Sequence, residues 1–236
     1  MGLTPVVEPR RTYIPAAGHA LTLPLYDPLV KLLGGDPTRR ILVEQAAIQP
    51  GHRVLEIGCG TGSLVLLVKR LHPDVDVVGL DPDPKALARG RRKTERAGVS
   101  IQFDQGFADE MPYPEGSFDR VFSSFMFHHL RRNEMEETLR EVRRVLKPGG
   151  FLHMLDFGGP ESRAEGFLAR LLHSSQQLRD NSQERILTLM SQAGFAGPRK
   201  ISQGAMLFGR IRVSYYRAEA ARKPRSLSTV RSSGAA

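Results

Sequence analysis

Residues 54–62 read Val-Leu-Glu-Ile-Gly-Cys-Gly-Thr-Gly, and this stretch decides the fold. The apolar run Arg53–Ile57 opens into three glycines at every second position, and Ser63–Leu71 continues as an apolar segment of helix length. Glycine lets the backbone turn sharply and approach a ligand closely at a helix N-terminus, where free N–H groups favour anions. The stretch therefore predicts a strand, a ligand-binding loop and a buried helix.

The rest of the chain alternates between strand and helix patterns. Strands are predicted over Val75–Leu80, Val99–Phe103, Phe118–Phe125 and Phe151–Asp156, and helices over Thr38–Ile48, Lys85–Ala97, Arg132–Leu146, Glu161–Leu178 and Ser182–Ala193. Such alternation implies right-handed βαβ units with helices on both faces of a parallel sheet. Two last strands, Arg199–Gln203 and Ala205–Tyr216, have only Gly204 between them and fit an antiparallel pair. We expect an α/β fold: a doubly wound, seven-stranded, mostly parallel sheet with an antiparallel last strand.

A chain of 236 residues fits one domain with appendages. We expect an N-terminal arm or lid over residues 1–37 and a domain over residues 38–216, with residues 157–195 inserted as a helical cover. Residues 217–236 lack aromatic side chains and end in Ser, Gly and Ala, a composition that cannot build a core. They are expected to form a disordered basic tail.

The formal net charge of +9 raises the question of a nucleic-acid partner. Residues from Arg217 onward carry a net +4 of this charge, which leaves +5 on residues 1–216. The tail fits either a solvated disordered end or a weak tether to an anionic surface. The charge on the body is compatible with an anionic ligand and does not require one.

Several classes of protein are excluded by composition. The longest unbroken hydrophobic run is Leu64–Val68, too short for a membrane span. A single cysteine, Cys59, excludes a disulfide framework and a multi-thiolate zinc site. His128 and His129 are adjacent, so on an extended stretch they would point apart and not chelate a metal together. Met1–Ala20 has three prolines and no apolar signal-peptide core, so the expected location is the cytoplasm.

The phase of the glycines narrows the choice of cofactor. The dinucleotide-binding pattern G-x-G-x-x-G would need glycine at position 63, which is Ser63. Asp81, at the end of the second predicted strand, could accept hydrogen bonds from two ribose hydroxyls. An acid at that position serves nicotinamide and adenosyl-sulfonium sites alike, so it is the glycine phase that disfavours a nicotinamide cofactor.

Five ordered motifs resemble those of class I S-adenosylmethionine-dependent methyltransferases, in particular the subgroup of ubiquinone/menaquinone-type C-methyltransferases and related small-molecule enzymes. The motifs are the glycine loop, Gly-Leu-Asp-Pro at 79–82, Met-Pro-Tyr-Pro-Glu-Gly-Ser-Phe-Asp at 111–119, Phe-His-His-Leu at 127–130 and Leu-Lys-Pro-Gly-Gly at 146–150. The resemblance implies S-adenosylmethionine as cofactor and in-line transfer of its methyl group to a carbon, oxygen or nitrogen of a small acceptor.

The resemblance also implies roles for single residues. The cofactor-binding set would be Glu56, Gly58 and Gly60 at the methionine moiety, Asp81 at the ribose, Pro82, Phe107 and Ala108 at the adenine, and Ser123 beside the methionine part. The family usually carries an acid or amide where this chain has Phe107. His128 and Asp156, near the carboxyl ends of two predicted strands, are the candidate bases for an acceptor that must lose a proton. No metal ligand is implied.

Two rival interpretations remain open. An RNA or protein methyltransferase would account for the net charge. The Asn/Asp-Pro-Pro-aromatic motif of amino-methylating nucleic-acid enzymes is absent, however, since residues 124–127 read Ser-Phe-Met-Phe. Cytosine-C5 methylation needs a cysteine nucleophile, and Cys59 lies in the glycine loop. The other rival is a non-catalytic module that uses the fold to bind a cofactor or a partner.

Overall fold

The computed structural model describes residues 34–157, 183–207, 209 and 211–221. Most of the predicted arm over residues 1–37, the helix predicted over Glu161–Leu178 and most of the predicted cover lie outside the described residues. Within the described part, no helix is both long and apolar enough to cross a membrane.

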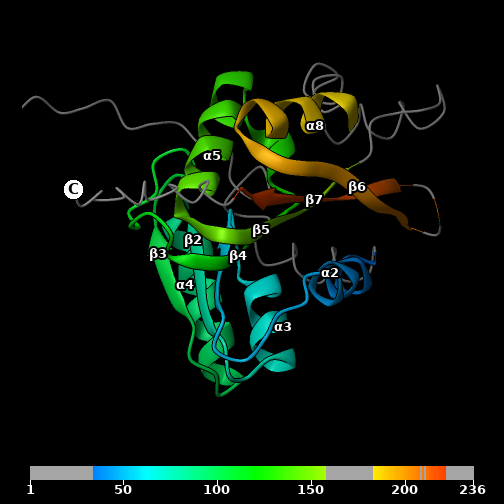
Figure 1. Ribbon diagram of the computed structural model, residues 1–236. Coiled ribbons are helices and arrows are strands. Elements are labelled where there is room, and N and C mark those ends of the chain that lie inside the picture. Colours follow the sequence, from blue (N-terminus) through cyan, green and yellow to red (C-terminus); the bar gives the residue numbers. More distant parts are fainter. Residues whose placement is uncertain (1–33, 158–182, 208, 210, 222–236) are drawn as a thin grey trace, which may run out of the picture.

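A seven-stranded sheet forms the centre of the molecule, in the order β3-β2-β1-β4-β5-β7-β6 (Figure 1). The strands are β1 (Arg53–Ile57), β2 (Asp76–Asp81), β3 (Gln102–Gln105), β4 (Phe118–Ser124), β5 (Leu146–Phe157), β6 (Phe195–Met206) and β7 (Ile211–Ala220). The first five run parallel, whereas β7 pairs antiparallel with both β5 and β6. The predicted fold class is confirmed, including the antiparallel end of the sheet.

Helices cover both faces of this sheet (Figure 1). They are α2 (Gly35–Glu44), α3 (Ser63–Leu71), α4 (Pro84–Arg96), the 3-10 helix η1 (Phe127–His129), α5 (Arg132–Val145) and α8 (Gln183–Gln192). Apolar side chains of α5 and α8 pack on one face in a cluster with Leu55 and Met154. Those of α2, α3 and α4 pack on the other face around Val54 and Phe122. Neighbouring residues of one strand therefore enter different cores, as the alternation of side chains along a strand requires.

The glycine loop between β1 and α3 has the predicted backbone. Gly58, Gly60 and Gly62 all have positive φ, at 63°, 52° and 73°. A Cβ atom added to Gly58 would lie 2.2 Å from Cγ of Met126, in the segment that follows β4. Glycine is required here because the loop is left-handed and closely packed.

Two details of the C-terminal strands differ from the predictions. β7 continues to Ala220, so placing the tail boundary after Tyr216 was wrong. Ala218 and Ala220 are buried, and Arg217 pairs with His153 of β5. Residues 217–220 alternate between charged and small buried side chains, which continues the strand. The prediction used the average composition of residues 217–236, in which this alternation is not visible. Gly204 is a register partner of Val213 inside the β6–β7 pair, and the turn residues that the structure describes between these strands are Leu207 and Gly209.

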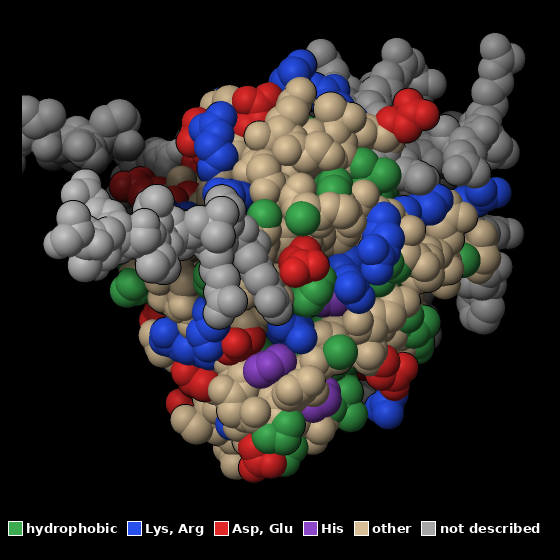
Figure 2. Space-filling view, in the orientation of Figure 1, with side chains coloured by type: hydrophobic (Ala, Val, Ile, Leu, Met, Phe, Trp, Pro, Cys, Tyr) green, Lys and Arg blue, Asp and Glu red, His purple; other side chains and the backbone are tan. Residues whose placement is uncertain are grey.

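The charged side chains on the face in Figure 2 form separate groups, with Lys and Arg divided by acidic and apolar side chains. The positive charge on that face is therefore not gathered into one continuous patch.

Candidate active site

A cavity of about 290 Å³ lies at the carboxyl ends of β1, β2 and β4. Four segments line it: the glycine loop, the end of β2, the residues after β3, and the segment from β4 into α5. Its lining residues include Arg39, Glu56, Gly58, Gly60, Thr61, Asp81, Pro82, Phe107, Ala108, Asp109, Ser124, Phe125, Met126, His129, Leu130, Arg131, Glu134 and Thr138. Ligands of open α/β sheets bind at this edge, outside the carboxyl ends of the strands.

Glu56 brings a buried carboxyl group into the cavity from β1. The residue is 3% exposed, and its Oε2 has no hydrogen-bond partner within the described part of the chain. Burial raises the pKa of this carboxyl to about 8, and the nearby Arg39 guanidinium opposes the rise. A buried carboxyl oxygen without a partner is costly unless a ligand supplies one. The site therefore suits a cationic group, such as an ammonium.

Positive groups lie close to this carboxyl. Arg39 reaches the cavity from α2 and is only 8% exposed. The N-terminus of α3 follows the glycine loop, and Lys93 of α4 donates hydrogen bonds to Thr61 Oγ1 (3.2 Å) and Ser63 Oγ (3.0 Å) there. A helix N-terminus and cationic side chains favour a carboxylate. Together with Glu56 they are complementary to both charged groups of an amino acid.

Asp81 ties the end of β2 to the glycine loop. Its Oδ2 accepts a hydrogen bond from Gly60 N (2.8 Å), and its Oδ1 accepts one from Asp83 N (2.9 Å). Burial raises the pKa of the Asp81 carboxyl, and these two hydrogen bonds oppose the rise. Each carboxylate oxygen has a further lone pair to offer, so the group can also accept from a vicinal diol.

Apolar groups continue the cavity beyond Asp81. Pro82, Phe107 and Ala108 line one side of this part, and Met126 and Leu130 also line the cavity. Gly106 holds the segment after β3 in place by donating from its N–H to the Asp81 carbonyl (3.2 Å). Such a slot suits a flat heteroaromatic ring. All the predicted cofactor residues line the cavity except Ser123.

Ser123 is fully buried within β4, and its neighbour Ser124 lines the cavity instead. Successive residues of a strand face opposite sides, so at this strand end it is Ser124 and not the predicted Ser123 that faces the cavity. Ser124 Oγ is buried without a hydrogen-bond partner among the described residues. The sequence offered no signal to separate two consecutive serines.

His128 and Asp156 form a buried pair next to the cavity. His128 Nδ1 lies 2.6 Å from Asp156 Oδ1, and the two residues are 2% and 0% exposed. Neither of them lines the cavity, whereas His129 does. The prediction that the two histidines point apart on an extended stretch was wrong, because η1 is a helical turn and their ring centroids lie 4.0 Å apart. Among the described residues, no group of three or more His, Cys, Asp or Glu could hold a metal ion.

Sequence reasoning missed several lining residues. Arg39 belongs to a helix that precedes the first motif, and Glu134 and Thr138 lie one turn apart on α5. Thr138 is 1% exposed, and its Oγ1 has no hydrogen-bond partner within the described ranges. Helical periodicity marks Thr138 as inward-facing, but only the packing of α5 brings it to the cavity.

Comparison with known proteins agrees with this geometry. A family model described as a methyltransferase domain matches residues 54–150. A demethylmenaquinone methyltransferase of Thermus thermophilus is 39% identical over 151 residues, which cover 63% of this chain and 68% of the relative. The same enzyme of Deinococcus radiodurans is 37% identical over 63% of this chain and 62% of its own length.

Solved structures share the fold at lower sequence identity. A SAM-dependent methyltransferase of Aquifex aeolicus aligns with a TM-score of 0.63 and 18% identity, covering 81% of this chain and 92% of that one. Haemonchus contortus phosphoethanolamine N-methyltransferase 2, solved with S-adenosyl-L-methionine, aligns with a TM-score of 0.65 and 15% identity over 86% of this chain and 59% of that one.

The sheet order, the glycine loop and a cavity complementary to an amino acid joined to a nucleoside define a methyltransferase that uses S-adenosylmethionine. The chain belongs to the family of S-adenosylmethionine-dependent methyltransferases. It transfers the methyl group of this cofactor to a small-molecule acceptor.

Proposed function

We propose that the acceptor is a hydroxylated aromatic ring of the quinol type, methylated on a ring carbon. Two observations support this acceptor. The similar proteins of known name include demethylmenaquinone methyltransferases. The cavity wall also carries the apolar side chains of Phe125, Met126 and Leu130, which suit a flat aromatic ring.

We further propose which residues hold the cofactor. The Glu56 carboxylate binds its ammonium, while the glycine loop and Arg39 bind its carboxylate. Asp81 accepts from the ribose hydroxyls, and Pro82, Phe107 and Ala108 enclose the adenine. Ser124, instead of the predicted Ser123, lies beside the methionine moiety of the cofactor. The unpartnered, buried Glu56 Oε2 in the same cavity as Asp81 is the observation that carries this assignment.

When bound, S-adenosylmethionine supplies an electrophilic methyl group on a sulfonium. The residues of the chain orient the acceptor against this methyl group and exclude water, which are the main contributions that such a displacement needs. Phe125 packs against Phe157 with ring centroids 5.0 Å apart, which gives the acceptor side a firm aromatic wall. His128 and Asp156, the candidate bases that the sequence indicates, lie behind His129, which lines the cavity.

Cofactor binding is tested with Asp81→Ala, and Asp76→Ala is the matched control because Asp76 is exposed on the same strand. Calorimetric titration with S-adenosylmethionine should show affinity at least about tenfold weaker for Asp81→Ala, since hydrogen bonds to a charged group are lost. The control should stay within about twofold of the parent protein. Equal affinity of the parent and Asp81→Ala would remove Asp81 from the site.

The acceptor is tested by transfer of a radiolabelled methyl group. A demethylated naphthoquinol, a catechol and a short RNA are offered separately to the same protein preparation. Incorporation into the naphthoquinol ring supports the proposal. Incorporation into RNA alone favours the rival enzyme class, and tight cofactor binding without transfer to any acceptor favours a non-catalytic module.

A further inference from the structure

We propose that His129 is the group that takes a proton from the acceptor, and that His128 and Asp156 act behind it as positioning residues. This inference rests on the proposed transfer to a hydroxylated ring. The sequence favours His128 as the residue that contacts the acceptor, whereas we assign this contact to His129.

The backbone of η1 separates the two histidines. The turn is closed by hydrogen bonds from His129 N to Met126 O (2.9 Å) and from Leu130 N to Phe127 O (3.1 Å). Phe127 and His128 are buried, whereas His129 is partly exposed and lines the cavity. Of the two imidazoles, only that of His129 lies where a ligand in the cavity can touch it. A base must come within hydrogen-bond reach of the proton that it takes.

The Asp156 carboxylate at the end of β5 fixes the ring behind His129. It accepts hydrogen bonds from the backbone N–H groups of His128 (3.0 Å) and Phe157 (2.7 Å), and it lies against His128 Nδ1. A carboxylate held by three groups and excluded from solvent is fixed in one orientation, and it fixes the imidazole that it contacts. His128 is therefore part of the framework of the site.

Contacts between aromatic rings fix the position of the His129 imidazole in turn. The His128 ring has Phe157 against it at 4.9 Å in an edge arrangement and His129 at 4.0 Å between centroids. The interplanar angle between the two imidazoles is 44°. His129 thus rests on a ring whose own position is determined by Asp156 and Phe157. A base on such a rigid support needs little reorganisation when the acceptor binds.

Charged groups in the same cavity favour a proton on His129 after transfer. Arg39 and Arg131 contribute positive charge, whereas Glu56, Asp81, Asp109 and Glu134 are carboxyls. Asp156 adds a buried carboxyl behind His128. Glu56 and Asp81 are taken up by the proposed cofactor contacts, which leaves Asp109 and Glu134 as the carboxyls of the lining that can stabilise an imidazolium in the cavity. The proton that leaves the acceptor can therefore stay in the site during methyl transfer.

Proton transfer to His129 accompanies methyl transfer to the ring. The O–H bond of the acceptor breaks, its electron pair stays on the ring oxygen, and the proton goes to an imidazole nitrogen of His129. The adjacent ring carbon forms a bond to the methyl carbon while the methyl–sulfur bond breaks and its electron pair goes to sulfur. The ring then loses its C–H proton to solvent, and His129 returns its proton to the oxygen. One proton is released in total.

His129→Asn is the decisive variant, with His128→Asn and Asp156→Asn alongside it and His72→Asn, at the far end of α3, as control. For each protein, kcat is measured over pH 5 to 9 with the naphthoquinol, and cofactor affinity is measured by calorimetry. We expect His129→Asn to lower kcat about 100-fold or more, remove the acidic limb of the pH profile and leave cofactor affinity within about twofold. Asp156→Asn should keep the limb but displace it and lower kcat less.

Several results would overturn the assignment. If His129→Asn kept kcat within about threefold and retained the acidic limb while His128→Asn lost it, His128 would be the base. If both histidine variants left the limb unchanged, neither would take the proton. Loss of cofactor affinity in His129→Asn would instead indicate a binding role.

A second measurement tests the contact without turnover. Imidazole nitrogen NMR of the parent protein is recorded with S-adenosylhomocysteine, before and after addition of a naphthol as acceptor analogue. The His129 signal should shift most, and a shift confined to His128 would count against the proposal. Failure of methyl transfer by the parent protein would refute the proposed acceptor, whereas this spectrum reports on His129 alone.

Discussion

Replacement of Glu56 by Gln should stabilise the cofactor-free protein at alkaline pH. The pKa of Glu56 is about 8 in the folded protein, because burial disfavours its charged form, against 4.5 for an exposed glutamate. Between these values the unfolded chain is ionised while the folded chain holds the proton, so stability falls as pH rises. The difference of about 3.5 pKa units corresponds to about 5 kcal/mol in the limit of high pH.

The measurement compares free energies of unfolding of the parent and Glu56→Gln, from urea titrations at pH 5 and pH 8. Other titrating groups cancel in the difference between the two proteins. The advantage of the variant should grow by about 3 to 4 kcal/mol between these pH values. The unpartnered buried amide of Glu56→Gln lowers the free energy of unfolding of the variant equally at pH 5 and pH 8. It therefore does not affect the change between the two pH values. A difference independent of pH would show that Glu56 ionises freely in the folded protein.

The same carboxyl makes cofactor binding proton-linked. At pH 7 a group with a pKa of about 8 is protonated in about nine molecules of ten, and it must ionise to pair with an ammonium. Calorimetric titrations in two buffers with different ionisation enthalpies should therefore give release of about 0.9 proton per cofactor from Glu56. Glu56→Gln should bind the cofactor at least about tenfold more weakly, because the carboxylate that pairs with the ammonium is gone. The variant should also lose the proton release that comes from Glu56. Identical proton release by both proteins would contradict the assignment of Glu56 to the ammonium.

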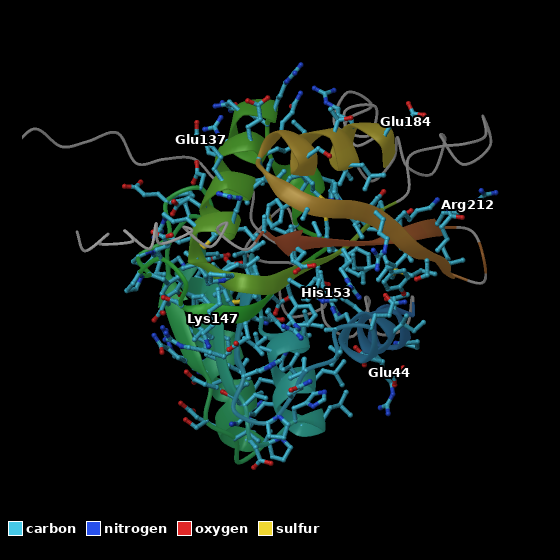
Figure 3. All side chains as sticks on the ribbon, viewed as in Figure 1. Glu44, Glu137, Lys147, His153, Glu184 and Arg212 are labelled. Carbon is cyan, nitrogen blue, oxygen red and sulfur yellow. The ribbon has the colours of Figure 1, made fainter. Side chains whose placement is uncertain are left out.

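Two further predictions concern stability away from the cavity. His153 is a buried residue of β5, within the sheet (Figure 3), and burial, together with Arg120 and Arg217, lowers its pKa to about 3. As pH falls below 6.5 the unfolded chain takes up a proton that the folded chain does not. The free energy of unfolding of the parent should therefore fall by about 3 kcal/mol between pH 7 and pH 4 relative to that of His153→Phe. Urea titrations that give the same change with pH for both proteins would contradict this prediction. A chain ended after Tyr216 should melt about 5 °C or more below one ended after residue 221, because the end of β7 is lost; equal melting temperatures would make that end dispensable.

The local signals in the sequence were sufficient for the centre of the fold. β1 and α3 have the predicted bounds. An apolar run, a glycine turn and a second apolar run specify strand, loop and helix through contacts between residues that are close in the sequence. The cofactor was implied by the resemblance of five ordered motifs to the methyltransferase family. The glycine phase by itself only disfavours a nicotinamide cofactor, and an acid at Asp81 serves both kinds of cofactor. The ends of β6 and β7 were predicted less well, since Gly204 resembles a turn residue and is in fact inside a strand.

The sequence by itself determined the fold class, the cofactor and the strand ends that meet at the cavity. Only the tertiary structure decided which member of each adjacent pair lines the cavity: Ser124 instead of Ser123, and His129 instead of His128. The physical reason is that a one-residue step reverses the side of a strand and rotates a helical turn by about 100°, so packing sets the direction. Arg39 likewise depends on packing, because α2 precedes the first motif in the sequence and only its position against the sheet brings Arg39 to the same cavity as Glu56.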